Sequence, residues 1–143
     1  MCFCWEISRE AAKNAKMEIE LVGKEVVDAA VTVHRELGPG LLESVYEVVM
    51  EDVLAGRGLV VERQVPIPIV HRGRQFTEGF RADLLVESEV IVELKSVEET
   101  SRVHFKQTLT YLRLADKRLG YLINFGAILM KKGITRIVNG LQH

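Results

Sequence analysis

Two acidic residues and a lysine interrupt an apolar stretch in the middle of the chain, Phe80–Lys95. Asp83 opens one run of strand-forming residues, and Glu93 and Lys95 close the next, with a short polar turn between the runs. Because side chains alternate along a strand, Glu93 and Lys95 point to the same face. If the two runs pair antiparallel, Asp83 lies close to both. Two carboxylates and an amine gathered there suit a divalent metal with a water-activating amine beside it.

Length and composition are those of one folded domain. The chain has 143 residues, of which 48% are hydrophobic and 27% charged, enough for a single core. No apolar run approaches the ~18 residues of a membrane span, and the N-terminus lacks a secretory signal pattern, so we expect a cytoplasmic protein. Cys2 and Cys4 lack the Cys-x-x-Cys spacing of zinc or thioredoxin-type sites and are interpreted as incidental thiols.

The charges are unevenly distributed, although the net charge is only −1. Residues 1–100 carry 11 basic against 19 acidic side chains, whereas residues 101–143 carry 8 against 1. The basic third could form a positive surface for a phosphate backbone beside the acidic cluster. The alternative is that the acidic and basic residues form two solvated faces of opposite charge, with no ligand.

Hydrophobic periodicity and chain breakers predict three helices. Residues 1–20 are expected to form a leader, either disordered or a short helix, ahead of one domain over residues 21–143. Apolar residues at three- and four-residue spacing predict the first helix of that domain, which Gly38-Pro39-Gly40 ends. The three predicted helices are residues 23–37, 42–55 and 102–116.

Strand signals occupy most of the remaining chain. Pro66 and Pro68 predict an edge strand, and Arg72-Gly73 predicts the turn of a hairpin. The predicted strands are residues 59–71, 74–86, 90–95 and 121–125, with 134–138 as a final strand or a short helix. This α-β-β-β-α-β order predicts a mixed β-sheet flanked by helices, in the α/β (α+β) class.

Three motifs resemble those of known nucleases. Asp83 followed after nine residues by Glu93-Leu94-Lys95 resembles the PD-(D/E)xK signature, with Ala82 in place of the proline. Gly40-Leu-Leu-Glu43-Ser-Val-Tyr46 is similar to the motif that names the GxxExxY proteins. Gln107-Thr-Leu-Thr-Tyr111 resembles the Gln-x-x-x-Tyr element of RecB-type nucleases.

This resemblance spans about Gly23 to Leu141 and implies a restriction-endonuclease-like core. It also implies a hydrolase: a nuclease that uses Mg²⁺ or Mn²⁺ to cleave DNA or RNA. A homodimer is one arrangement open to so small a nuclease.

Phosphodiester hydrolysis needs a nucleophilic water and charge stabilisation, which carboxylate-held Mg²⁺ supplies. Asp83 and Glu93 would bind the metal, with the backbone carbonyl of Leu94 as a third oxygen. Glu43 could add a carboxylate directly or through water. Lys95 would orient or deprotonate the attacking water, or stabilise the charge on the phosphate.

The remaining candidates have structural alternatives. Gln107 and Tyr111 share a helix face and could contact the lysine, the phosphate or a base, but Tyr111 could equally be a core aromatic. Glu43 could be an acid that suits a helix start. His34 and Tyr46 are interpreted as structural. Asp83 could simply end the strand pairing, and Glu93 and Lys95 could be an exposed pair of little energetic value.

The alternative function is a catalytically inactive module that keeps the fold for nucleic-acid or protein binding. Hydrolysis of a small phosphorylated substrate is a third reading that the residues leave open.

Overall fold

A computed structural model describes the backbone of residues 3–141 and the side chains of residues 19–141. The predicted leader and its two cysteines fall almost wholly outside the residues with described side chains, so that expectation stays a prediction. Within the described part of the chain, no helix has the length and apolar character needed to span a bilayer. The helices are α1 (Phe3–Leu37), α2 (Glu43–Gly56), α3 (Arg102–Leu114) and α4 (Met130–Gly133). The strands are β1 (Val61–His71), β2 (Arg74–Val86), β3 (Val90–Lys95), β4 (Leu119–Asn124) and β5 (Ile134–Val138).

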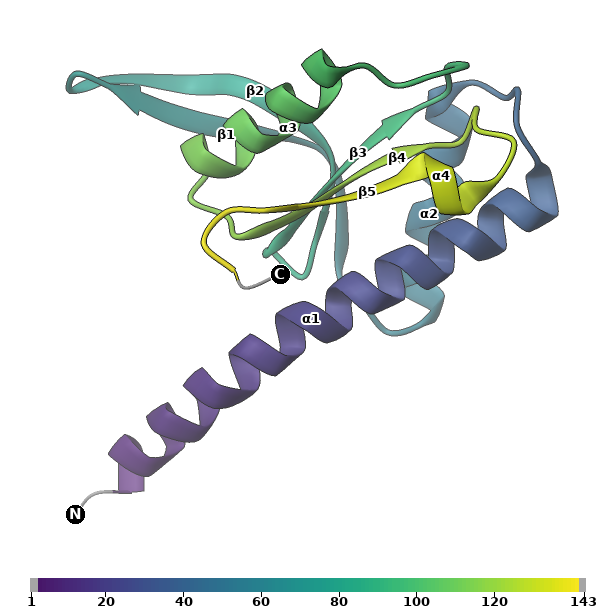
Figure 1. The fold of residues 1–143 in the computed structure, drawn as a ribbon. Coiled ribbons are helices and arrows are strands. Elements are labelled where there is room, and N and C mark those ends of the chain that lie inside the picture. The colour runs from purple at the N-terminus through teal and green to yellow at the C-terminus, as the bar shows by residue number, and fades with distance from the viewer. Residues whose placement is uncertain (1–2, 142–143) are drawn as a thin grey trace.

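The five strands form one mixed sheet in the order β1-β2-β3-β4-β5. All neighbours are antiparallel except β3 and β4, which are parallel because α3 connects them as a crossover. Helices α1 and α2 cover one face and α3 covers the other (Figure 1). This arrangement confirms the predicted mixed sheet flanked by helices.

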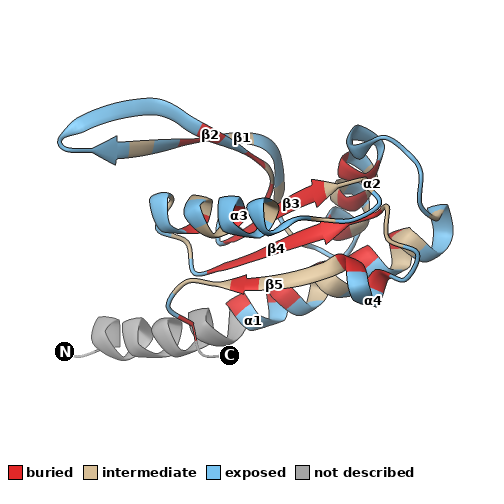
Figure 2. Cartoon of the chain, turned by 45° about the horizontal axis from the view of Figure 1, so that its top comes forward, coloured by how far each residue is buried: buried red, intermediate tan, exposed pale blue. Residues whose placement is uncertain are grey.

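Two apolar clusters, one on each face, hold β3 and β4 at the centre, where both strands are almost fully buried (Figure 2). On the first face, α1 contributes an apolar stripe at helical spacing that includes Val22, Val26 and Val33. On the second, α3 contributes Leu112. An ideal Cβ on Gly120 would lie 3.1 Å from that leucine and from the Ile91 carbonyl, so a glycine in β4 lets α3 pack closely.

The predicted boundaries hold within a few residues except at the start of α1, which begins at Phe3 rather than at residue 23. There is also one difference of type. Lys132-Gly133 belongs to the short helix α4 rather than to a simple turn, and β5 follows it directly as a strand. Helix α3 ends at Leu114, two residues earlier than predicted, because Asp116 takes a left-handed conformation (φ 53°).

The segment that leaves β3 is held by a polar knot at the end of β4. Asn124, which is 3% exposed, accepts the N–H groups of Val97 and Gly126 on its Oδ1 and donates from Nδ2 to the Val97 carbonyl. Phe125 donates its N–H to the Lys95 carbonyl at 2.8 Å. The end of β3, which carries Lys95, is therefore fixed by main-chain and side-chain bonds together.

Gly126→Ala should destabilise the protein by roughly 2–4 kcal/mol. An ideal Cβ on Gly126 would lie 2.1 Å from the Val97 carbonyl oxygen, so the knot must open to admit a methyl group. Gly56→Ala is the matched control, since a Cβ there has no neighbour within 4 Å among the described residues. Denaturant unfolding measures both, and equal stability of the two variants would contradict the role of the knot.

Candidate active site

Strands β2 and β3 separate where the two predicted acids lie. Their pairing ends at Leu84 and Val92, and beyond this point β2 pairs only with β1. We call this opening the fork. The side chain of Asp83 fills it in place of a paired strand, because its Oδ2 accepts the backbone N–H of Leu94 at 2.8 Å.

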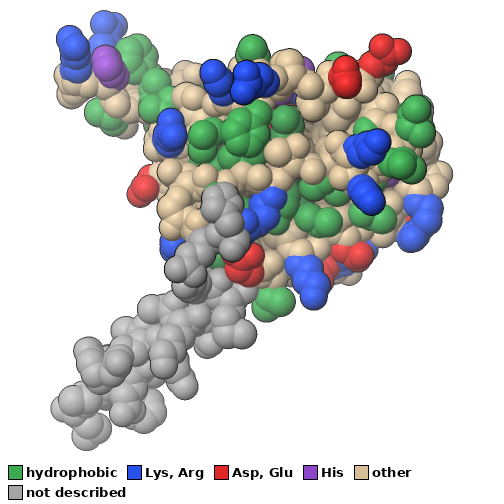
Figure 3. All heavy atoms as spheres, viewed as in Figure 1, with side chains coloured by type: hydrophobic (Ala, Val, Ile, Leu, Met, Phe, Trp, Pro, Cys, Tyr) green, Lys and Arg blue, Asp and Glu red, His purple; other side chains and the backbone are tan. Residues whose placement is uncertain are grey.

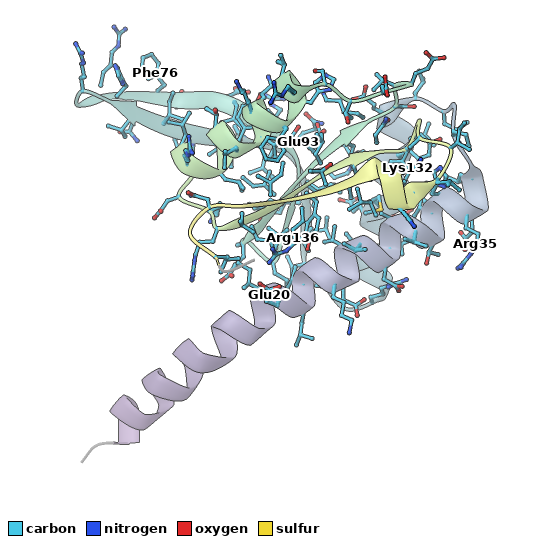
Figure 4. The ribbon with its side chains drawn as sticks, viewed as in Figure 1. Glu20, Arg35, Phe76, Glu93, Lys132 and Arg136 are labelled. Carbon is cyan, nitrogen blue, oxygen red and sulfur yellow. The ribbon has the colours of Figure 1, made fainter. Side chains whose placement is uncertain are left out.

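Glu93 lies beside Asp83 in the fork. Its Oε1 is 3.4 Å from the backbone nitrogen of Asp83, which donates to it, and Glu93 is only 8% exposed. Figure 4 shows Glu93 between α3 and the central strands. Burial raises the pKa of Glu93 to about 8; the negative charge of Asp83 adds to the rise and the ammonium of Lys95 opposes it. Asp83 and Glu93 are therefore in contact, and the charge of Lys95 acts on Glu93.

The Leu94 carbonyl also faces the fork. The two backbone groups of one strand residue point to the same edge, and successive residues alternate edges. The Lys95 carbonyl bonds to Phe125, beyond the end of β4, whereas the Leu94 N–H bonds to Asp83. The carbonyl of Leu94 therefore points toward Asp83, where it can serve as an oxygen ligand.

Helix α3 brings Tyr111 and Gln107 to the same place. Burial raises the pKa of the Tyr111 hydroxyl, the charges of Glu93 and Asp83 add to it, and a hydrogen bond with Gln107 lowers it. The Tyr111 ring stacks on Phe80 of β2, with centroids 4.0 Å apart. Tyr111 is therefore both a packing residue and a hydroxyl close to the acids, which combines the two readings made from the sequence.

Glu43 does not join this group. It is exposed at the start of α2 and makes no hydrogen bond or ion pair with any residue among 19–141. One turn later, Glu47 is 7% exposed and its Oε2 accepts a bond of 2.9 Å from Gln64. The Oε1 of Glu47 has no hydrogen-bond partner among the described residues, and Arg63 is 3.7 Å away.

Gln64 connects the buried acid of α2 to the fork. Its Nε2 donates to Glu47 and, at 3.4 Å, to Oδ1 of Asp83. The register places Gln64 opposite Asp83, between the pairs Arg63–Leu84 and Val65–Ala82. Its φ of 52° is left-handed, a strained conformation for a glutamine within a strand. An amide nitrogen between two carboxylates marks a place where positive charge is favoured.

The other motif residues hold loops rather than line the fork. Tyr46 is fully buried, stacks on Phe125 with centroids 4.3 Å apart, and its hydroxyl binds the Gly38 carbonyl and the Leu41 N–H. His34 bonds to the Ala127 carbonyl at 2.7 Å. Both residues are structural, as the sequence predicted.

The residues of the fork fit a hard divalent cation. Among the described side chains, no three His, Cys, Asp or Glu residues are close enough to hold a metal alone. A cation would therefore use the carboxylates of Asp83 and Glu93, the Leu94 carbonyl and water, an all-oxygen set of the kind that Mg²⁺ binds. It would also offset the burial and the repulsion from Asp83 that raise the pKa of Glu93. The Oε1 of Glu47, which forms an ion pair with Arg63 but no hydrogen bond within the described part of the chain, offers a further acceptor one amide away.

Fold and fork together define a class of protein. The family model of the PD-(D/E)XK nuclease superfamily matches residues 20–137. The chain therefore belongs to the PD-(D/E)XK nuclease superfamily. A search of curated proteins finds no match, and neither does a search of solved structures. The narrower assignment to the GxxExxY proteins stays a prediction.

The sequence reading missed Glu47 and Gln64. Glu47 carried a signal, because it is one turn from Glu43 and next to Tyr46 on the buried side of α2. Gln64 carried none: a single amide in an extended segment does not predict a left-handed backbone or a bond to two acids.

In the presence of a chelator, the free energy of unfolding should fall as the pH rises from about 5 to 8. The reason is Glu93, whose ordinary pKa of 4.5 is raised by the fold to about 8. Between these values the unfolded chain loses the Glu93 proton while the folded chain keeps it, so the unfolded state binds fewer protons. The cost is on the order of 3 kcal/mol at pH 7.

Glu93→Gln should therefore flatten this pH dependence and raise the melting temperature at pH 8. Glu89→Gln, at an exposed turn position, is the control and should leave the slope as in the wild type. Parallel pH profiles for wild type and Glu93→Gln would contradict the raised pKa.

Proposed function

We propose that this chain is a nuclease that uses Mg²⁺ or Mn²⁺ to hydrolyse phosphodiester bonds of DNA or RNA. Membership of the superfamily supports the class of reaction. The observation that carries the proposal is the pair of acids in the fork, Asp83 and Glu93, with Lys95 beside them. The predicted homodimer and cytoplasmic location stay predictions.

In this proposal Asp83, Glu93 and the Leu94 carbonyl hold the cation. When bound, the cation would supply charge stabilisation on the phosphate and a more acidic water. Lys95, on the same face as Glu93, orients or deprotonates the attacking water or stabilises the charge on the phosphate. Tyr111 and Gln107 would position the scissile phosphate, because a hydroxyl and an amide are suitable donors to its oxygens.

Helix α2 offers two acids that could support the cation, Glu43 and Glu47. Glu47 is favoured, because it is buried and connects through Gln64 to Asp83. For Glu47 to reach a cation, the Gln64 amide would turn aside or stay between them as a bridge. Glu43 would then contribute to metal binding only through a water molecule.

Glu47→Gln should weaken Mn²⁺ binding by about 10–100-fold, as loss of a supporting or direct acid does. The measurement is the rise of the melting temperature with Mn²⁺ concentration, since a ligand of the folded state raises it. Glu43→Gln should shift this titration little. A larger shift for Glu43→Gln than for Glu47→Gln would return the role to Glu43.

Purified protein should cleave labelled DNA or RNA with Mg²⁺ or Mn²⁺ and not with a chelator. Asp83→Asn should abolish cleavage, and Lys95→Gln should lower kcat by about 10²-fold or more. Lys24→Gln, at an exposed position on α1, should keep wild-type activity. Cleavage that persists in both site variants would belong to a contaminant or another site.

A second candidate, the non-catalytic module, is favoured by one observation. The amide of Gln64 already occupies the space between Glu47 and Asp83 and satisfies one oxygen of each. If that bridge replaces the cation permanently, the protein binds nucleic acid in a salt-dependent manner without turnover. Its melting temperature then stays unchanged when Mn²⁺ is added.

A further inference from the structure

The β1–β2 hairpin extends past the body of the protein as an arm, which we define as residues 68–79. Figures 1 and 2 both show it projecting beyond the end of α3. Residues 71–79 are all exposed, including Phe76 at 41%. A two-stranded hairpin with so little packing is marginally stable in water. The length of the arm is therefore not explained by the core.

The turn at the tip carries a cation in an unfavourable place. Arg72 and Gly73 have φ of 50° and 77°, the two left-handed positions of a type I′ turn. Asn, Asp or Gly would adopt the first position with less strain than arginine. The arm thus carries a positive charge at the turn, at a position where the backbone conformation favours Asn, Asp or Gly over Arg72.

Charge and aromatic surface gather on one face of the tip. His71 pairs with Arg74, and Ile69 pairs with Phe76, so these four side chains share a face. The Arg74 guanidinium lies 5.4 Å from the Phe76 ring centroid. Neither Arg72 nor Arg74 has an acidic side chain within 4 Å among residues 19–141, whereas Arg81 at the base pairs with Glu78. Figure 3 shows basic side chains and a histidine together at this tip.

The arm is continuous with the fork. Strand β2 runs from Arg74 near the tip to Asp83 in the fork, and the nine steps between these residues span at most about 30 Å. At the base of the arm, Phe80 stacks on Tyr111 of α3. One turn of B-form DNA is about 34 Å long. A duplex lying along the arm can therefore reach the tip and the fork at once.

Helix α3 adds a second row of positive charge on its exposed side, opposite Tyr111. Arg102, Lys106 and Arg113 are exposed and lie on one face of the helix at i, i+4 and i+11. Figure 3 shows basic side chains over α3. A duplex that covers the arm and this side of α3 would meet cations from both elements.

We propose that the arm enters the major groove of B-form DNA and holds a duplex across the fork. The B-form major groove, about 12 Å wide, admits a two-stranded β-ribbon. The major groove of A-form RNA is deep and narrow and excludes side chains, so double-stranded RNA does not fit. The inference rests on the proposed function only in treating the bound duplex as the substrate.

Binding is measured by fluorescence anisotropy in a chelator, so that no cleavage occurs. The probes are a 30-base-pair DNA duplex, the RNA duplex of the same sequence and each single strand. Wild type should bind the DNA duplex most tightly. The double variant R72A/R74A should weaken this binding about tenfold or more and lower the salt dependence by about two phosphate contacts.

The control R35A/K132A removes the same charge from the opposite end of the molecule, as Figure 4 shows by the positions of Arg35, Lys132 and Phe76. It should bind the duplex nearly as wild type does. Arg72→Asn separates folding from charge, because Asn-Gly is a preferred type I′ turn. This variant should bind DNA more weakly although its turn is favoured. Equal losses in arm and control variants, unchanged binding by Arg72→Asn, or tighter binding of RNA or single strands would overturn the inference.

Hydrolysis of a small phosphodiester, bis(p-nitrophenyl) phosphate, distinguishes failure of the docking proposal from failure of the nuclease proposal. With Mn²⁺, the arm variants should hydrolyse it as wild type does but should cleave the DNA duplex with a raised KM. If wild type hydrolyses neither substrate, the nuclease proposal fails, while the anisotropy measurements still decide the role of the arm. Equal loss on both substrates would mean that the arm variants damage the fork itself, which contradicts a docking role.

Discussion

One side-chain-to-backbone bond governs the centre of this protein: Asp83 accepts the N–H of Leu94 where β2 leaves β3. A strand that ends its pairing inside a protein leaves backbone donors without partners, and each costs free energy unless it is satisfied. Here a carboxylate satisfies the donor. The bond therefore brings Asp83 next to Glu93. Burial, with the charge of Asp83 adding to it, raises the pKa of Glu93 and keeps a proton on it near neutral pH. A stable sheet and a buried, adjacent pair of acids result from the same opening.

The rest of the fold fixes this opening from two sides. Apolar clusters on both faces bury β3 and β4 and hold them rigid. The knot of Asn124 and Gly126 holds the chain that follows Lys95, and Tyr46 holds the loop before α2. These residues bind loops in place and thereby position the acids without contacting them. By contrast, the outer part of β2 is free of the core, so the sheet continues on one side of the fork as an exposed arm (Figure 1).

Three departures from the local rules of protein structure lie at the fork and the arm. Gln64 is left-handed within a strand, one oxygen of Glu47 is buried without a hydrogen bond, and Arg72 occupies a turn position that favours asparagine or glycine. Strain and unsatisfied polar groups of this kind concentrate at functional sites, where the surrounding structure enforces them. The core of the sheet, which is far better packed and satisfied, provides that surrounding structure.

The sequence alone determined the class of fold and the pair of acids, because both depend on local chemistry. Periodicity and chain breakers set the helices and strands, and a three-residue turn between two apolar runs brings Asp83 to Glu93 whatever the rest of the chain does. Only the tertiary structure shows which acid of α2 lies toward the fork: Glu47 contacts Gln64, and Glu43 is exposed. That outcome depends on how α2 rotates against β1, and on a backbone conformation of Gln64 that only contacts between distant segments stabilise. Whether the hairpin lies on the core or projects from it was likewise decided by packing, since alternation along a strand is the same in both cases.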